Sequence, residues 1–245
     1  MAVTAADAIE PREPKYYLVK RHLLDLIELL EPGALVPTER ELTATLATSR
    51  TTVRQALGEL VGEGRLVRRQ GSGTYVAEPK MTWPLQMTSF TEQAAANGFI
   101  AGARLLSSER VRATGEAATR LRLLPGAYMY RIERLRLADD TPMAVETSHL
   151  SVARFPGLIK ALRKSSSLYR VLEASYGVRP LTAEETIETR AASPREAALL
   201  GTDTGAPMLV LGRHSFEADG TPVEWVRSWY RGDRYTFVAR LTTTG

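Results

Sequence analysis

The stretch that decides the fold is residues 37–76, PTERELTATLATSRTTVRQALGELVGEGRLVRRQGSGTYV. Thr38 and Glu41 have the T-x-x-E spacing of a capping box, in which each side chain bonds a free backbone N–H at the start of a helix. After a short polar break, Ser49 is a suitable N-cap for a second helix. Apolar residues then recur at helical spacing over residues 53–61. Two helices joined by a tight turn are therefore predicted.

A glycine-tipped hairpin follows the second predicted helix. Residues 65–76 contain two short strand-like runs around the turn Gly71-Ser72-Gly73. Glycine allows positive φ and lets the backbone approach a phosphate or the minor groove closely. Two helices followed by such a hairpin are the outline of a winged helix-turn-helix, so DNA binding is the first hypothesis.

DNA contacts are expected from the start of the second helix and from the hairpin. The arginine forks of Arg50 and Arg54 match guanine O6 and N7, and each such pair contributes roughly 1–3 kcal/mol of base discrimination. Hydroxyl groups suit phosphate contacts that position the helix. The residues expected at DNA are Arg40, Ser49, Arg50, Thr51, Thr52, Arg54, Arg69, Gln70, Gly71, Ser72 and Gly73. Taken alone, any one arginine is more often a solvated surface residue, and the hairpin arginines have Glu59 and Glu63 as alternative partners.

Composition sets bounds on the rest of the chain. The 245 residues are enough for a small domain and a larger one. The chain has no cysteine and three scattered histidines, so disulfides and thiolate metal sites are excluded, and we expect no metal or cofactor. No apolar run reaches the roughly 20 residues of a membrane span, and no signal-peptide pattern is present. We therefore expect a cytoplasmic protein with no membrane partner.

The net charge of +4 gives no support for nucleic-acid binding by itself. Residues 1–80 hold 11 Lys+Arg against 11 Asp+Glu, whereas residues 81–245 hold 21 against 17. The positive excess thus lies outside the predicted DNA-binding region. Only the local placement of arginines in the second helix and the hairpin supports DNA binding.

Breaks in the pattern divide the chain into an arm, two domains and a linker. Residues 1–13 are alanine-rich without an apolar stripe, which predicts a flexible arm. An amphipathic helix before the capping box completes a small domain at 14–77, and prolines bracket a polar linker at 78–86. From 87 to 245 the pattern predicts an α+β domain built on an antiparallel sheet. Strands are expected at 128–137, 142–150, 183–192 and 208–217, and helices at 157–162 and 168–176.

Short motifs spread over nearly the whole chain carry a resemblance to a known family. They are residues 37–42, 49–57, 71–74, 88–92, 133–136, 142–146, 167–169 and 222–225. In these motifs the chain resembles transcription regulators of the GntR family, HutC subfamily. The resemblance implies a homodimeric, non-enzymatic regulator, which we expect to be a repressor. It would bind palindromic double-stranded operator DNA through its winged helix-turn-helix. The resemblance also implies that residues 87–245 are a chorismate-lyase-like effector-binding and dimerisation domain, in which a small molecule changes the DNA affinity.

Within that subfamily, the sequence is similar to regulators that respond to N-acetylglucosamine 6-phosphate or glucosamine 6-phosphate. The resemblance implies an effector site made of Ser89, Phe90, Thr91, Arg134, Arg136, Glu146, Ser167, Tyr169, Glu224 and Tyr230. The backbone N–H groups of residues 89–91, the two arginines and the hydroxyls of Ser167 and Tyr169 suit a phosphate dianion. The two glutamates and Tyr230 match positions that hold the sugar ring.

The same residues also have ordinary explanations. Arg134 and Arg136 lie two apart on a predicted strand and share a face, where Glu146 would complete a surface ion-pair ladder. Glu224 would be an edge-strand residue, and the tyrosines would be core or interface aromatics.

Three other functions stay open at this point. The first is the same kind of regulator with a different effector, such as another sugar phosphate or a carboxylate; the phosphate-binding residues argue against urocanate. The second is a DNA-binding protein with a vestigial pocket. The third is a chorismate-lyase-like enzyme, which we disfavour because no nucleophile–base pair, metal set or nucleotide loop is visible in the sequence.

Overall fold

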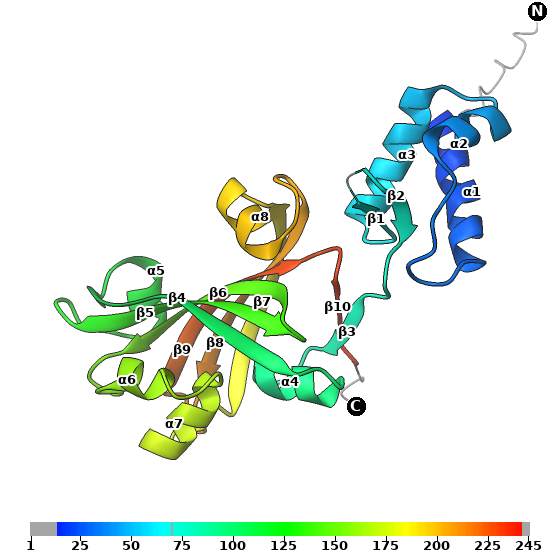
Figure 1. The fold of residues 1–245 in the computed structure, drawn as a ribbon. Coiled ribbons are helices and arrows are strands. Elements are labelled where there is room, and N and C mark those ends of the chain that lie inside the picture. Colours follow the sequence, from blue (N-terminus) through cyan, green and yellow to red (C-terminus); the bar gives the residue numbers. More distant parts are fainter. Residues whose placement is uncertain (1–13, 70, 242–245) are drawn as a thin grey trace, which may run out of the picture. The chain divides into compact units, whose positions relative to one another are not determined.

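Two compact units divide the chain in the computed structural model, residues 1–79 and residues 80–245 (Figure 1). The structure describes residues 14–69 and 71–241. The arm expected at 1–13 and the expected DNA contact Gln70 lie outside the described residues. None of the described helices is long and apolar enough to cross a membrane.

Three helices and a two-stranded hairpin make up the N-terminal unit. Helix α1 (Lys15–Glu28) packs against α3 (Arg50–Gly62), and α2 (Glu39–Thr45) precedes the tight turn before α3. Strands β1 (Leu66–Arg69) and β2 (Gly73–Val76) pair antiparallel and form the predicted hairpin.

Local capping and apolar burial explain the form of the N-terminal unit. The Thr38 N–H donates to the Glu41 carboxylate at 2.7 Å and the Thr38 hydroxyl accepts from the Glu41 N–H at 3.3 Å, so the predicted capping box is present. The Ser49 hydroxyl accepts from the Thr52 N–H at 3.1 Å and caps α3. Each buried Leu, Ile or Val contributes about 1.5–3 kcal/mol to folding. The core consists of Val19, Leu23, Ile27, Val36, Leu42, Val53, Ala56, Leu57, Leu60, Leu66 and Val76.

A six-stranded antiparallel sheet forms the centre of the C-terminal unit, in the order β4-β5-β6-β9-β8-β7. The strands are β4 (Ala101–Arg112), β5 (Tyr128–Ala138), β6 (Thr141–Ser151), β7 (Thr182–Ala191), β8 (Pro207–Phe216) and β9 (Pro222–Arg231). The helices are α4 (Phe90–Ala96), α5 (Gly115–Arg120), α6 (Leu158–Leu162), α7 (Leu168–Tyr176) and α8 (Pro194–Leu200).

The helices cover both faces of this sheet (Figure 1). Alternate residues of β5 point to opposite faces, so Ile132 packs with α6 and α7 while Leu135 packs with α8. Phe90 and Ala94 of α4 belong to a third cluster on the same face as α6 and α7. This face, which α4 and α7 border, carries the site described below.

The local patterns predicted most of the sheet but not its order. All four predicted strands and both predicted helices are present within one residue at either end. Strand β9, which carries Glu224, is not an edge strand, because it pairs with β6 on one side and β8 on the other. The reason is topological: the order of strands depends on pairings between distant segments, which a local pattern does not contain.

Part of the stretch expected to be a linker is a strand. Residues Met81–Pro84 form β3, which pairs parallel with β10 (Tyr235–Val238). The Trp83 side chain is fully buried and packs edge to face on Tyr235, with ring centroids 4.7 Å apart. The flanking prolines suggested a linker. The strand could not be predicted from the local sequence, because its partner β10 lies about 150 residues later in the chain.

Candidate functional site

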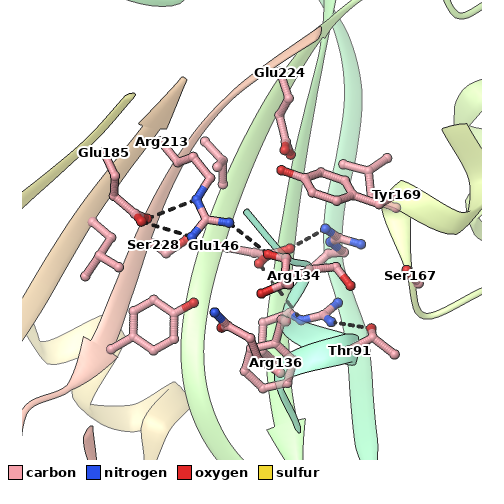
Figure 2. Close-up of a pocket in the computed structure, with 18 residues that line it drawn as sticks. Thr91, Arg134, Arg136, Glu146, Ser167, Tyr169, Glu185, Arg213, Glu224 and Ser228 are labelled. Atoms are coloured by element: carbon pink, nitrogen blue, oxygen red, sulfur yellow. Dashed lines mark hydrogen bonds and ion pairs between the residues drawn. The ribbon is translucent and has the colours of Figure 1, made fainter. Parts of the chain in front are cut away.

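A cavity opens between the sheet and the starts of α4 and α7 (Figure 2). Its empty volume is about 560 Å³ including space open to solvent, which lies within the roughly 300–1,000 Å³ of small-molecule sites. The structure brings together all ten residues that the sequence suggested for an effector. These are Ser89, Phe90, Thr91, Arg134, Arg136, Glu146, Ser167, Tyr169, Glu224 and Tyr230.

Two arginines of β5 and one glutamate of β6 form the centre of the cavity wall. The strand register sets Arg134 opposite Glu146, and the two side chains form an ion pair. Arg136 Nε lies 3.9 Å from Glu146 Oε2. The exposed fractions are 7%, 2% and 7% for Arg134, Arg136 and Glu146. The pairing that was considered as a surface ladder is thus a buried cluster.

Arg136 connects the sheet to the two helices at the cavity mouth. Its Nη2 donates to Thr91 Oγ1 at 3.1 Å (Figure 2). Its Nη1 donates to the Ser166 carbonyl at 2.8 Å. The guanidinium carbon also lies over the Phe90 ring, 4.5 Å from the centroid. One side chain therefore fixes the starts of α4 and α7 against β5.

Several buried polar atoms in the wall have no hydrogen-bond partner among the described residues. They are the donors Nε and Nη1 of Arg134 and Nε of Arg136, the hydroxyl Oγ1 of Thr88, and the acceptor Oε1 of Glu146, which has only its ion pair with Arg134. Buried donors and acceptors are normally paired, because an unpaired one costs about 1–3 kcal/mol. Unpaired donors that converge on a cavity indicate an occupant rich in acceptors.

The two predicted glutamates have opposite protonation tendencies. Burial by itself raises the pKa of Glu146, but the charges of Arg134 and Arg136 outweigh it, and the net pKa of that carboxyl is lowered. Burial also raises the pKa of Glu224, where the Ser148 hydroxyl opposes the rise and the charge of Glu146 adds to it. Of these two carboxyl groups, Glu146 therefore favours its ionised form and Glu224 takes up a proton more readily.

Tyr169 and Glu224 lie near each other on one side of the cavity, away from Arg136 and Thr91 (Figure 2). The Tyr169 hydroxyl and Ser215 Oγ are 3.1 Å apart. Burial raises the pKa of the Tyr169 hydroxyl, so this group stays protonated and can donate a hydrogen bond. This side of the cavity is suited to hydroxyl and amide groups.

The predicted backbone nest is smaller than expected. The Ser89 N–H donates to Glu92 Oε2 at 2.7 Å, and Ser89 Oγ accepts from the Glu92 N–H at 3.2 Å. A capping box thus occupies the first of the three N–H groups that were assigned to a phosphate. The N–H groups of Phe90 and Thr91 belong to the first helical turn, which has no intrahelical acceptor for them.

Sequence reasoning missed a third arginine of the cavity. Arg213 on β8 binds Glu185 on β7 through Nε and Nη2, both at 3.0 Å, and its Nη1 donates to the Thr88 carbonyl at 2.8 Å. Burial alone lowers the pKa of Arg213, but the bonds to Glu185 outweigh it and raise the net pKa. The available signal was position: Arg213 follows Leu209 and Leu211 at alternate places on β8, and both leucines pack into the core beside α4. The other lining residues that were missed are Thr88, Gln93, Leu168, Glu185, Leu211, Val226 and Ser228.

In the N-terminal unit, the two arginines expected to read bases have different surroundings. Both Arg50 and Arg54 are exposed on α3. Arg54 Nε binds Glu39 Oε2 of α2 at 2.7 Å, so this side chain starts with a partner inside the protein. Arg40, Thr51, Gly71 and Gly73 are also exposed.

The expected hydroxyl and hairpin contacts have internal partners as well. The hydroxyls of Ser49 and Thr52 are 2.8 Å apart, and Ser72 Oγ is hydrogen-bonded to the Tyr75 hydroxyl. The Arg69 guanidinium lies over the Tyr75 ring, 4.5 Å from its centroid.

The glutamates considered as partners of the hairpin arginines bind elsewhere. Glu59 and Glu63 both pair with Lys20 of α1. Within residues 14–69 and 71–241, neither glutamate forms an ion pair with a hairpin arginine.

Comparison with known proteins assigns both units. Residues 15–76 match the model described as bacterial regulatory proteins, gntR family, and residues 96–236 match the UTRA domain. The chain is 40% identical to the HTH-type transcriptional repressor NagR of Bacillus subtilis over 92% of this chain and 93% of that protein. It is 39% identical to the HTH-type transcriptional repressor PhnF of Mycolicibacterium smegmatis over 94% of this chain and 93% of that protein.

A solved structure agrees with the sequence matches. The crystal structure of PhnF from Mycobacterium smegmatis aligns with a TM-score of 0.66 at 38% identity, over 92% of this chain and all of that one. Because these relatives are transcriptional regulators, the enzyme alternative is set aside. The chain belongs to the GntR family, HutC subfamily, as a ligand-responsive transcriptional repressor with a DNA-binding unit and a UTRA effector domain.

Proposed function

We propose that the effector is an amino-sugar phosphate, with N-acetylglucosamine 6-phosphate and glucosamine 6-phosphate as first candidates. The observation that carries the proposal is the set of unpaired buried donors on Arg134 and Arg136 beside Glu146. A phosphate dianion supplies acceptors for these donors and competes with Glu146 for the same guanidinium groups. Similarity alone does not choose an effector, because NagR and PhnF are almost equally identical to this chain.

The phosphate end of the proposed ligand lies between β5 and the two helix starts. Arg134 and Arg136 neutralise its charge, and the Phe90 and Thr91 N–H groups add two further donors. The Ser167 hydroxyl accepts from the Arg170 N–H at 3.3 Å, and its proton stays available for a phosphate oxygen. Movement of Arg136 toward the phosphate weakens its bonds to Thr91 and to the Ser166 carbonyl, which gives the helix starts a way to respond.

The sugar end lies toward Glu224 and Tyr230. Glu146 and Glu224 accept hydrogen bonds from ring hydroxyls or from an amide N–H, and the Tyr169 hydroxyl donates to a ring or acetyl oxygen. The Tyr230 ring is 8% exposed and packs against Tyr235, with centroids 4.9 Å apart. It closes the apolar side of the ring site.

The test is isothermal titration against N-acetylglucosamine 6-phosphate, glucosamine 6-phosphate and glucose 6-phosphate. We expect the two amino sugars to bind and Arg134→Ala to abolish binding. Arg131→Ala is the matched control, because Arg131 lies on the same strand but does not line the cavity. Silence from all three sugars would overturn the effector assignment and leave the regulator assignment intact. Loss of binding in both variants would show that the effect is not specific to the cavity.

For the DNA-binding half, we propose a homodimer, formed through the UTRA unit, that sets two α3 helices on a palindromic operator. Arg50 and Arg54 read bases, while Arg40, Thr51, the caps of α3 and the hairpin contact the backbone. A monomer in light scattering at micromolar concentration would contradict the dimer. Because coupling is reciprocal, operator DNA must change the effector affinity by the factor with which effector changes the DNA affinity. Equal titrations with and without operator would rule out this coupling.

A further inference from the structure

The positive charge of the chain is concentrated in one segment of the effector unit. Residues 152–181 hold six Lys+Arg and one Asp+Glu, whereas the rest of the chain holds 26 Lys+Arg and 27 Asp+Glu. The net charge of +4 is therefore smaller than the excess in this segment alone. The segment contains α6 and α7, and neither DNA recognition nor the effector cavity accounts for its charge.

A groove runs between α6 and α7, which pack side by side (Figure 1). Its empty volume is about 1270 Å³ including space open to solvent. The apolar part of its lining consists of Pro156, Ala161, Val171, Ala174 and the Tyr176 ring. The Tyr176 hydroxyl donates to the Pro156 carbonyl at 2.9 Å and packs one end of the groove together.

The cations of the groove have no counter-charge in the part of the chain that the structure describes. Lys160, Lys164 and Arg170 line it, and none of the described residues that share the lining is acidic. No described carboxylate lies within ion-pair distance of these three cations, whereas Arg154 of the same segment binds Glu217 at 2.6 Å. Clustered like charges repel one another and lower stability unless a partner neutralises them.

The groove is separate from the effector cavity. Residues Ser167, Leu168 and Tyr169 at the start of α7 line the cavity, whereas Arg170 and Val171 line the groove. No described residue lines both. An occupant of the groove is therefore additional to the effector.

Charge and shape narrow the choice of occupant. A second copy of the chain is disfavoured, because a two-fold interface would set this cationic segment against itself. Duplex DNA would match the charge but would leave the apolar floor uncovered. An amphipathic helix with apolar residues on one face and carboxylates beside them matches both the floor and the rim.

We propose that the α6–α7 groove docks an acidic, amphipathic helical segment of a partner protein. The apolar side chains of the segment cover Pro156, Ala161 and Ala174, and its carboxylates pair with Lys160, Lys164 and Arg170. This interaction is independent of the effector assignment.

The test uses the full-length protein and a fluorescein-labelled synthetic helix with leucine on one face and glutamate on the other. Fluorescence anisotropy should show binding that weakens as salt is raised. We expect Lys160→Glu/Lys164→Glu to weaken peptide binding about tenfold, because two surface ion pairs of modest strength are lost. The matched control is Arg163→Glu/Arg179→Glu, an equal charge change at two exposed residues outside the groove lining, which should have an effect of less than about threefold.

Two further probes decide the class of partner. The first probe is a peptide with serine in place of leucine, which keeps the charge and loses the apolar face, so it should bind more weakly. The second probe is a non-operator DNA duplex, which should bind equally well to the wild type and to the double variant. No binding of the amphipathic peptide, or equal binding by the double variant, would overturn the proposal. The proposal would also be overturned if the double variant lost affinity for the duplex and the wild type bound the leucine and serine peptides equally, because the surface would then bind DNA phosphates. If the charge reversals misfold, Lys160→Ala/Lys164→Ala replaces them, with circular dichroism as the check.

Discussion

The arginines of the effector cavity and those of helix α3 differ in how firmly their surroundings are fixed. Arg134 and Arg136 are buried, and their charges face Glu146 inside the protein. The Arg54 side chain is 66% exposed, and its partner Glu39 is also at the surface. A buried arginine has its geometry set by the core, so its loss disturbs folding and ligand binding together. An exposed arginine exchanges water or a surface partner for DNA, so its loss changes DNA binding alone.

Removing Glu146 tests the buried side of this comparison and should have the largest effect. Glu146→Ala leaves Arg134 without its buried counter-ion, and we expect the free energy of unfolding of the C-terminal unit to fall by about 3–5 kcal/mol. Urea unfolding followed by tryptophan fluorescence measures it, because Trp83, Trp225 and Trp229 all lie in this unit. Glu109→Ala on β4 is the control, since Glu109 is exposed. A loss no larger than that of the control would refute the stabilising role of the buried cluster.

Replacing Arg50 tests the exposed side. We expect Arg50→Ala to leave stability unchanged and to weaken binding to an operator selected from random duplexes by about 1–3 kcal/mol, since a bidentate base contact is lost. Anisotropy with the operator and with a scrambled duplex separates base reading from phosphate contact. Equal losses on both duplexes would identify Arg50 as a phosphate-binding residue instead.

The pH dependence sharpens the contrast within the cavity itself. The pKa of Glu146 is lowered on folding, so its contribution to stability is present above the ordinary glutamate pKa and is lost as the pH falls through the lowered value. The pKa of Glu224 is raised, so folding favours its protonated form and stability falls as the pH rises toward that raised value. Glu224→Gln should therefore stabilise the unit relative to wild type at neutral pH, and this gain should shrink as the pH is lowered. Thermal unfolding over a pH series measures this, and a gain that does not vary with pH would contradict it.

The smallest effect is expected where an exposed pair is broken. Glu39→Gln removes the partner of Arg54, and because surface ion pairs are worth about 0–1 kcal/mol, stability should hardly change. DNA affinity should rise, since a negative charge near the phosphates is removed and Arg54 is released. If DNA affinity falls, Glu39 orients Arg54 for binding, and a double-mutant cycle with Arg54→Ala measures that coupling.

The local sequence patterns predicted the features that depend on residues close together in the chain. The capping box at Thr38, the cap at Ser49 and the strand lengths follow from residues within a few positions of each other, and all are present. The site residues came from the family resemblance, because two arginines at alternate positions have the same pattern in a surface ladder and in a buried cavity. What decides between the two is the cover supplied by α4 and α7, which are distant in sequence from β5.

Arg213 and the β3–β10 pair were missed for a related reason. Arg213 is a cavity residue because Glu185 and the Thr88 carbonyl meet it from β7 and from the approach to α4. The pairing of β3 with β10 joins segments from opposite ends of the unit. The alternation of β8 indicates which face Arg213 shares with Leu211 but not its partners, and the β3–β10 pairing leaves no local trace in the sequence.

The β3–β10 pair has a consequence for the tether between the two units. With β3 paired, the chain outside regular structure between β2 and β3 is residues 77–80, four residues in place of the nine expected at 78–86. The end-to-end distance of a flexible chain grows roughly as the square root of its length, so this tether reaches about two-thirds as far. The effective concentration of one unit near the other rises about threefold by the same scaling. The last described strand of the effector unit thereby limits how far the DNA-binding unit can range in search of its half-site.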